Sequence, residues 1–442
     1  MKPRIVILGG GFAGIATAAT LERKLRSNEA ELVLVSRENF SVFTPMLPEA
    51  CSGELDVRHI VTPIRSQLRR TQFILADVAA LDVNARKVTY THILTGITET
   101  LSYDHLVLAL GSTTSTFNLS GVAEYSFPLK TLEDAAVLRN RMVWLLELAD
   151  STPESRRRKQ LLTIAVVGGG FTGVETAGEL ADFFKNVLRF YPRVPRDLLR
   201  VVLIEGGPTL LPGLPPEMGR YAARNLEKRG VEVLTGDVVA RVDAESIVLQ
   251  SGAQIESATI IWSAGVKPSP VVAAADLPRT PRGNVRVGED FRAEGVDRLW
   301  AAGDCAAVPD GSGGYQPLTA QHAIREGPTL AENLVRVLRG KPTRPFRFQS
   351  LGMMASLGAR KAVAQLPGNF VLTGFPAWFL WRTYYLLRLP GLDRKLRVAF
   401  DWTLELLFPR DIAELRIYSR RAQSSAASDA GFPARDDPDA LL

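Results

Sequence analysis

The chain is poor in cysteine and has no long apolar run. Its 442 residues include only two cysteines, Cys51 and Cys305, and no Cys-x-x-Cys pair. The absence of such a pair excludes the dithiol chemistry of thioredoxin-like and disulfide-reducing enzymes, and isolated cysteines weakly favour a reducing compartment. The longest uncharged stretch, 362–381, is interrupted by proline and glycine, so we expect no membrane-spanning helix. The apolar run 5–8 is also too short for a signal peptide.

The sequence also lacks the marks of a nucleic-acid-binding or metal-binding protein. The net charge is +6 and the pI about 9.3, but the Lys and Arg residues form no dense stripe, so no nucleic-acid partner is predicted. The basic run 156–159 is interpreted as a solvated cluster before a strand, and no metal site is predicted. The length, with 46% hydrophobic residues, predicts an ordinary globular protein of two or three domains.

Two glycine turns dominate what is present. Each follows a short apolar strand and opens a helical stretch with Gly-x-Gly-x-x-Gly spacing; the glycines are Gly9, Gly11 and Gly14 in the first turn and Gly168, Gly170 and Gly173 in the second. The first glycine allows a tight turn, the second lets a pyrophosphate approach the backbone, and the third lets helix and strand pack closely. The phosphates then lie at the positive end of the helix. Two such turns predict two bound dinucleotides, and a flavin with a nicotinamide is the economical pair.

The two halves of the chain follow one plan. After each turn come a helix, a strand, a long connection and a buried strand that ends at a glycine, Gly111 in the first half and Gly265 in the second. The predicted strands are 31–35, 72–75, 87–91, 103–111, 200–204, 259–262 and 299–305, and a predicted helix covers 129–150. The fold class is therefore α/β.

Polar residues at the strand ends are candidate nucleotide ligands. In such folds a carboxylate that closes the second strand binds ribose hydroxyls. In the second half this residue is Glu205, whose charge favours NADH over NADPH; a plain surface glutamate is the alternative. In the first half the position holds Ser36, followed by Arg37, which is able to pair with or stack on the nucleotide. Asp304, in a Gly-Asp turn, is either a ligand of a ribityl chain or part of an ordinary turn.

Two further polar residues are candidates for chemistry at the rings. Glu175 follows the last glycine of the second turn by two positions, so it either stabilises the helix start or orients the nicotinamide and handles a proton. Gln321, next to Ala320 at the start of a predicted helix, is a candidate for hydrogen-bonding a carbonyl, and the positive end of that helix would stabilise a reduced flavin. His322 beside it is interpreted as structural.

The C-terminal segment suggests a membrane surface. One face of a predicted helix carries Leu396, Ala399, Phe400, Thr403 and Leu407, and the opposite face carries Arg394, Arg397, Asp401 and Glu405. The aromatic and basic stretch 375–388 precedes it, a composition that suits the headgroup region. A helix pair packed on the core or in a dimer interface is the alternative.

Together these features resemble the type II NADH:quinone oxidoreductases, which are single-subunit enzymes that do not pump protons. The resemblance covers residues 1–415 and is carried by both glycine turns, the loop 43–48 (Phe-Thr-Pro-Met-Leu-Pro), the segments 129–135, 261–266 and 301–304, the Ala-Gln helix start and the aromatic C-terminal segment. It implies two Rossmann-like dinucleotide-binding domains of the glutathione-reductase type and a C-terminal amphipathic helical region that associates with the membrane.

The resemblance further implies non-covalent FAD in the first unit, NADH in the second, a quinone as the electron acceptor, a homodimer, and a peripheral position on the cytoplasmic face of the membrane. The domains would be 1–120 and 291–345 for FAD, 121–290 for NADH, 346–421 for membrane association and dimerisation, and 422–442 as a disordered tail. Glu175 and Gln321 would be catalytic. The FAD residues would be Gly9, Gly11, Phe12, Ala13, Gly14, Ser36, Arg37, Val78, Gly111, Asp304, Ala320, Gln321 and Lys361, and the NADH residues Gly168, Gly170, Gly173, Glu205 and Gly265.

Three other functions are also consistent with the sequence. A soluble ferredoxin reductase would share both turns but has no need of the amphipathic segment. A sulfide:quinone oxidoreductase needs sulfur-carrying cysteines, a role that Cys51 and Cys305 do not suit. A redox-signalling flavoprotein of slow turnover would also keep both turns.

Overall fold

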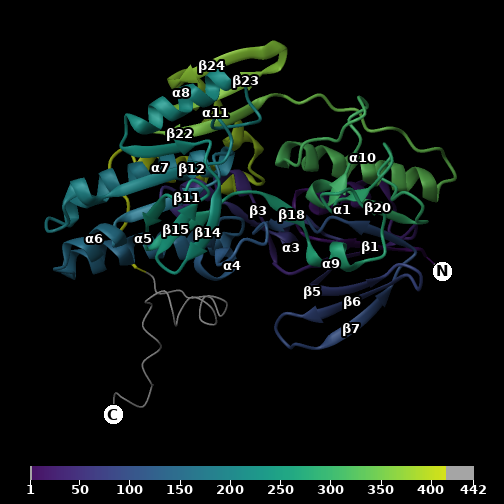
Figure 1. Cartoon of the computed structure of the whole chain (residues 1–442). Coiled ribbons are helices and arrows are strands. Elements are labelled where there is room, and N and C mark those ends of the chain that lie inside the picture. The colour runs from purple at the N-terminus through teal and green to yellow at the C-terminus, as the bar shows by residue number, and fades with distance from the viewer. Residues whose placement is uncertain (1, 415–442) are drawn as a thin grey trace. The chain divides into compact units, whose positions relative to one another are not determined.

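A computed structural model describes residues 2–414, which fall into two compact units (Figure 1). Unit 1 contains residues up to 42, 61–113 and 266–350, and unit 2 contains 43–60, 114–265 and 351 onwards. The predicted disordered tail, 422–442, and the end of the predicted C-terminal region lie outside the described residues.

The elements of unit 1 are β1 (Arg4–Leu8), α1 (Phe12–Lys24), β2 (Glu31–Ser36), β3 (Phe40–Val42), β4 (Val61–Pro63), α3 (Ile64–Gln67), β5 (Gln72–Asp82), β6 (Lys87–His92), β7 (Thr98–Ser102), β8 (His105–Leu108), β9 (Ser112–Thr114), β18 (Val266–Pro268), α9 (Pro270–Ala274), β19 (Val285–Arg286), β20 (Leu299–Ala301), β21 (Ala306–Ala307) and α10 (Ala320–Leu338).

Unit 1 is built on a seven-stranded sheet of order β20-β8-β1-β2-β5-β6-β7. The strands from β20 to β5 pair in parallel, and β6 and β7 are added antiparallel. Residues 5–8 of β1 are fully buried between β8 and β2, the continuous apolar pattern of a parallel sheet covered on both faces. The helices α1 and α10 lie side by side (Figure 1), because Gly327 of α10 lets the backbones approach: a Cβ there would be 2.6 Å from the carbonyl oxygen of Ala13.

The elements of unit 2 are α2 (Leu47–Cys51), α4 (Val122–Tyr125), β10 (Phe127–Pro128), α5 (Leu132–Ser151), α6 (Ser155–Leu161), β11 (Thr163–Val167), α7 (Phe171–Val187), β12 (Arg200–Glu205), α8 (Pro216–Glu227), β13 (Val231–Thr235), β14 (Val239–Asp243), β15 (Ser246–Leu249), β16 (Gln254–Glu256), β17 (Thr259–Trp262), β22 (Met353–Gly358), β23 (Lys361–Leu366), β24 (Phe370–Gly374), α11 (Phe375–Arg388) and α12 (Leu392–Leu404).

Unit 2 repeats the plan on a five-stranded parallel sheet of order β10-β17-β11-β12-β13. Two antiparallel three-stranded sheets, β14-β15-β16 and β22-β23-β24, belong to the same unit. The long helix α5 begins at a capping box, in which the Thr131 hydroxyl accepts from the Asp134 N–H while the Asp134 carboxylate accepts from the Thr131 N–H. The predicted α/β class is confirmed in both units.

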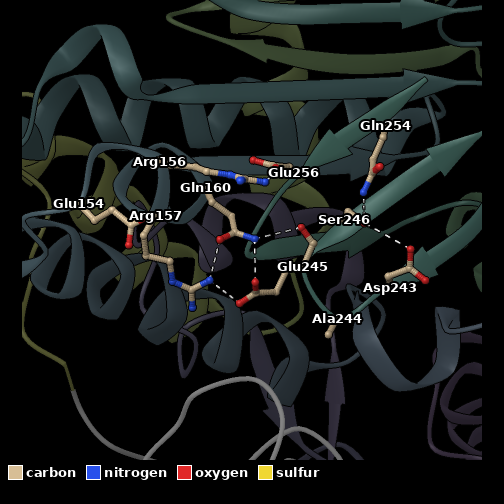
Figure 2. Close-up of a pocket in the computed structure, with 10 residues that line it drawn as sticks. All are labelled: Glu154, Arg156, Arg157, Gln160, Asp243, Ala244, Glu245, Ser246, Gln254 and Glu256. Atoms are coloured by element: carbon tan, nitrogen blue, oxygen red, sulfur yellow. Dashed lines mark hydrogen bonds and ion pairs between the residues drawn. The ribbon is translucent and has the colours of Figure 1, made fainter.

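The basic run 156–159 lies on α6, directly before the strand β11. Figure 2 shows the surface hollow beside it, where Arg157 and Gln160 both donate to the Glu245 carboxylate and Arg156 lies 2.6 Å from Glu256. The cluster is therefore solvated but also paired with acids of the β14-β15-β16 sheet, and none of the predicted site residues lines the hollow.

No helix among residues 2–414 is both long enough and apolar enough to cross a bilayer. The uncharged stretch 362–381 instead forms β23, β24 and the first half of α11.

Candidate functional site

The glycine turn of unit 1 has the geometry that its sequence predicts. Gly9 has a φ of +109°, and a Cβ there would lie 2.1 Å from the carbonyl oxygen of Ala109. A Cβ at Gly14 would lie 1.9 Å from the carbonyl oxygen of Gly9. A Cβ at Gly11, in contrast, would meet no atom within 4 Å. The outer glycines are thus required by the fold, while the middle one leaves its outer side accessible.

The turn of unit 2 reproduces this pattern. Gly168 has a φ of +105°, and a Cβ there would lie 2.8 Å from the amide nitrogen of Ala264. A Cβ at Gly173 would lie 1.8 Å from the carbonyl oxygen of Gly168, whereas one at Gly170 would meet nothing within 4 Å.

Both turns fit the pyrophosphate of a dinucleotide. The helices α1 and α7 begin directly after Gly11 and Gly170, so their positive ends lie at the accessible side of each turn. Both turns stand at the carboxyl end of a central parallel strand, where doubly wound sheets bind their ligands. The residues present therefore suit FAD and NADH, one in each unit.

The two residues that close the second strands occupy equivalent places. Ser36 lies against Gly10, because a Cβ on that glycine would be 2.6 Å from the Ser36 hydroxyl. Glu205 lies against Gly169 in the same way, and its carboxylate accepts N–H donors from Gly169 and Gly207, each at 2.6 Å. The strand-end position of Glu205 is confirmed, and its carboxylate is held by the turn backbone rather than extending into solvent.

We expect Glu205→Arg to shift the preference from NADH towards NADPH. The substitution removes a carboxylate that would repel a 2′-phosphate and supplies a cation, so the ratio of kcat/KM for the two nucleotides should change at least about tenfold. Steady-state kinetics with both nucleotides measure this ratio. Glu227→Arg is the matched control, since Glu227 is exposed at the far end of α8; an unchanged ratio in Glu205→Arg would contradict the assignment.

Asp304 is fixed at the end of β20 by unit 1. Its carboxylate accepts from the Ser112 hydroxyl at 2.6 Å, and its carbonyl accepts from the Asn284 side chain at 2.8 Å. The preceding Gly303 has a φ of +72°, and its N–H donates to Glu326 at 2.7 Å. Burial raises the pKa of Glu326 to about 7. Sequence reasoning missed Glu326, since a lone acid inside a helix carries no local signal of burial.

The start of α10 also agrees with the sequence. Gln321 is half-buried, and its side-chain amide donates to the Ser350 hydroxyl at 3.0 Å. His322 is buried and its Nδ1 lies 2.7 Å from the Thr319 hydroxyl; burial lowers its pKa to about 4. A neutral, buried and hydrogen-bonded ring supports the structural interpretation of His322.

Glu175 does not behave as a helix-start residue. It is buried in unit 2, and its Oε1 accepts from the Ser356 N–H at 3.0 Å and from the Trp381 indole N–H at 3.2 Å. Burial raises the pKa of Glu175 to about 8, against the opposing effect of these two donors. A solvated helix terminus would give neither the burial nor these partners.

Trp381 departs from the expectation for the aromatic segment. The sequence assigned the whole stretch 375–388 to an interface with lipid, but Trp381 is almost fully buried and its ring lies edge-on to Tyr385, with 4.8 Å between the ring centroids. Phe375, Phe379 and Leu387 are exposed on the same helix. The aromatic residues of α11 therefore divide between an inner and an outer set.

Near Glu175 the structure reveals an acidic cluster that the sequence did not predict. Arg410 is 1% exposed, and its Nη2 lies 3.1 Å from Glu54, 3.0 Å from Glu179 and 3.0 Å from Glu405. Burial, with repulsion from Glu179 and Glu49, raises the pKa of Glu54 well above its ordinary value. These residues are scattered along the chain, so no spacing signals that they meet. The cluster attaches the segment after α12 to the interior of unit 2.

The face of α12 that packs against the rest of unit 2 carries the buried Val398 and Trp402 together with Asp401. Asp401 Oδ2 lies 2.5 Å from His59 Nδ1 and accepts from the Asp56 N–H at 3.3 Å. Leu392, Leu396 and Phe400 are 73%, 63% and 63% exposed. The alternative that the apolar face of α12 packs on the core of the chain is therefore wrong. A second copy of the protein or a membrane surface is left as what covers this face.

The remaining predicted residues lie in several settings. Val78 is buried in β5, Arg37 is exposed, and Gly111 and Gly265 have φ values of +65° and +72° at the ends of buried strands. Lys361 belongs to unit 2, where its ammonium donates to Asn225 at 3.3 Å, so its assignment to FAD stays a prediction. Both cysteines are buried, and burial raises both thiol pKa values.

Comparison with known proteins agrees with this geometry. The model of the pyridine nucleotide-disulphide oxidoreductase family matches residues 3–327, and that of the NDH2 C-terminal domain matches residues 351–411. The chain is 34% identical to the internal alternative NAD(P)H-ubiquinone oxidoreductase A1 of Solanum tuberosum mitochondria, over 94% of this chain and 88% of that protein. It is 32% identical to a type II NADH:quinone oxidoreductase of Mycobacterium tuberculosis, over 92% and 89% of the two chains.

A solved structure of NDH2 from Plasmodium falciparum in complex with NADH has the same fold, with a TM-score of 0.87 at 23% identity over 93% of this chain and all of that one. Since the family models and the relatives both cover nearly all of the described sequence, the chain belongs to the pyridine nucleotide-disulphide oxidoreductases and, among them, to the type II NADH:quinone oxidoreductases.

Proposed function

We propose that the protein oxidises NADH through bound FAD and passes the two electrons to a quinone at a membrane surface, without pumping protons. The duplicated glycine turn carries this proposal, because Gly11 and Gly170 each leave one side of the backbone accessible at a helix N-terminus. The names of the relatives from Solanum tuberosum and Mycobacterium tuberculosis support a quinone as the acceptor. FAD, when bound, accepts a hydride from NADH at N5 and passes electrons on in pairs.

Unit 1 would hold FAD and unit 2 would hold NADH. The functional domains predicted from the sequence, 1–120 with 291–345 for FAD and 121–290 for NADH, follow these units except at 43–60, 114–120 and 266–290, which lie in the other unit. Around FAD, Ser36 and Arg37 would contact the adenosine, and Asp304 the ribityl chain, because each lies at or just after the carboxyl end of a strand, at the ligand edge of the sheet. Around NADH, the Glu205 carboxylate would accept hydrogen bonds from the ribose hydroxyls. The others in the FAD set are Gly9, Gly11, Phe12, Ala13, Gly14, Val78, Gly111, Ala320, Gln321 and Lys361, and in the NADH set Gly168, Gly170, Gly173 and Gly265.

Glu175 and Gln321 would serve the quinone half of the reaction. Reduction of a quinone to a hydroquinone takes up two electrons and two protons; the hydride of NADH brings both electrons and one proton, so one further proton must be supplied. Oε1 of Glu175 already accepts two hydrogen bonds, so a proton on this carboxyl would reside on Oε2. With a pKa near 8 the group is protonated at neutral pH and can donate that proton. The side-chain amide of Gln321 would hydrogen-bond a quinone carbonyl.

The pH profile tests the role of Glu175. The fraction of protonated Glu175 falls as the pH rises through about 8, so quinone reduction in the native protein should decline across that range. Glu175→Gln should lower kcat with quinone roughly 10²-fold or more, which is the upper part of the usual contribution of a positioned acid, and should remove this inflection. Stopped-flow measurement of flavin reduction by NADH is the control, and it should change little. An unchanged inflection in the variant would assign the pH dependence to another group.

The exposed apolar face of α11 and α12 would lie on the cytoplasmic face of the membrane, and the protein would be a homodimer. The apolar side chains that point outward and the adjacent basic residues Arg388 and Arg397 suit the headgroup region.

The buried cysteines weakly favour a reducing compartment. Sedimentation in detergent tests the dimer, and protease protection in inverted vesicles tests the side of the membrane.

One spectroscopic experiment separates the candidate functions. The purified protein should be yellow, should bleach on addition of NADH without oxygen, and should regain its colour on addition of a soluble quinone. Bleaching without re-oxidation by quinone would favour a soluble reductase. A protein that carries FAD but does not bleach would favour the signalling role.

A further inference from the structure

Phe117 stands out in unit 2 as a strained and exposed aromatic residue. It has a φ of +50°, and Asn118 after it has a φ of +57°, both in the left-handed region that side chains rarely adopt. The Phe117 side chain is 59% exposed. Strain of this kind persists where the surrounding structure imposes it, and it gathers at ligand-binding sites.

The structure fixes Phe117 at the carboxyl end of β17. The Trp262 indole N–H donates to the Ser115 carbonyl at 2.8 Å, and the Ser115 N–H donates to the Gly265 carbonyl at 3.2 Å. The Phe117 N–H donates to the Ser115 hydroxyl at 3.3 Å. The ring lies directly on Gly265, since a Cβ on that glycine would be 2.4 Å from Cζ of Phe117.

This position borders the second glycine turn. The residue before Gly265 is Ala264, and its amide nitrogen is the atom that a Cβ on Gly168 would approach to 2.8 Å. Ligands of doubly wound sheets lie outside the carboxyl ends of the strands. The Cζ end of the Phe117 ring is thus against Gly265, and the exposed remainder of the side chain lies at the ligand edge of the sheet. A ring that served only to fill space beside Gly265 would be buried rather than mostly exposed.

We infer that Phe117 stacks on a planar ring of NADH and so positions the nucleotide in unit 2. This inference depends on the proposed function. An aromatic side chain offers a flat apolar face that both the adenine and the nicotinamide can use. The strained backbone would hold the ring in place before the nucleotide arrives, which reduces the ordering cost of binding.

The test measures nucleotide binding to the FAD-loaded protein by calorimetry. Phe117→Gly removes the ring but suits the left-handed backbone, so the fold should be kept. We expect the Kd for NAD⁺ to rise about three- to tenfold, which is the range for an aromatic stacking pair. Phe117→Tyr keeps the ring and should restore native affinity. The KM for NADH should rise in Phe117→Gly while kcat with a soluble quinone stays near the native value.

ADP-ribose, which lacks the nicotinamide, identifies the stacked ring. If Phe117→Gly weakens ADP-ribose and NAD⁺ alike, the ring stacks on the adenine; if it weakens NAD⁺ alone, the ring stacks on the nicotinamide. Unchanged Kd values for both ligands would overturn the inference. Failure of the native protein to bind NAD⁺ would instead overturn the proposed function, so the two failures are distinguishable.

Discussion

Changing Gly170 to valine should abolish the reduction of bound FAD by NADH while the fold and the FAD remain intact. Gly170 has φ and ψ of −71° and −171°, extended values that valine adopts without strain, and a Cβ there meets no protein atom within 4 Å. The side chain would instead occupy the space through which a pyrophosphate approaches the backbone. We expect kcat/KM for NADH to fall at least about 100-fold, since small displacements of a reacting ligand have effects of this size.

The measurement combines two reductants. NADH should fail to bleach the flavin of Gly170→Val, whereas dithionite should bleach it fully. The matched variant Gly11→Val, with the same accessible geometry in unit 1, should yield a colourless protein that FAD does not reconstitute. If Gly170→Val bleaches normally with NADH while Gly11→Val loses FAD, the second turn does not bind the nicotinamide nucleotide.

Placing glutamates on the outer face of α12 should release the protein from membranes. Leu396 and Phe400 lie one turn apart and are both 63% exposed. Burial of each of these side chains in lipid would stabilise the membrane-bound state by about 1.5–3 kcal/mol. The double variant Leu396→Glu with Phe400→Glu should therefore weaken partition into the membrane by more than about 100-fold. Flotation with lipid vesicles measures the partition, and activity with a hydrophilic quinone should be kept.

The control places the same added charge elsewhere. Thr98 and Thr100 are exposed on β7 in unit 1, so Thr98→Glu with Thr100→Glu should leave flotation unchanged. Equal flotation of both double variants with the native protein would show that α12 is not the membrane contact; a dimer interface would then be the better explanation of its apolar face.

Point substitutions test the membrane contact more cleanly than deletion of residues 376–442. Deletion would also remove Arg410, whose guanidinium lies 3.1 Å from the buried carboxyl of Glu54 and 3.0 Å from that of Glu179. Removing one partner of a buried ionic cluster costs about 3–5 kcal/mol, so a truncated chain would leave the membrane through misfolding as readily as through loss of its anchor.

The parts of the site that the sequence predicts well are those encoded within a few residues. The glycine turns, Glu205 and the Gly-Asp turn at Asp304 each depend on a local strand-turn-helix pattern. In such a pattern the residue spacing itself determines the backbone geometry. Glu175 was recognisable as a candidate for the same reason.

The partners of these residues could not be predicted, because they come from distant segments. Ser356 and Trp381, which donate to Glu175, lie 181 and 206 positions later in the chain. The sequence predicted a helix with Leu396 and Phe400 on one face, and α12 exposes both side chains. Periodicity, however, says only that two faces differ and not which one packs inward. The burial of Val398 and Trp402 and the contact of Asp401 with His59 decide that question, and no local sequence pattern indicates either.

The burial of both native thiols has a practical consequence. Cys51 and Cys305 are fully enclosed and are held as unreactive thiols, since burial raises their pKa values. Maleimide reagents should therefore leave the native chain unlabelled. A single cysteine introduced at Phe400 would then accept a spin label or an environment-sensitive dye without prior removal of Cys51 and Cys305, and its quenching by lipid-depth probes would report how far α12 enters the bilayer.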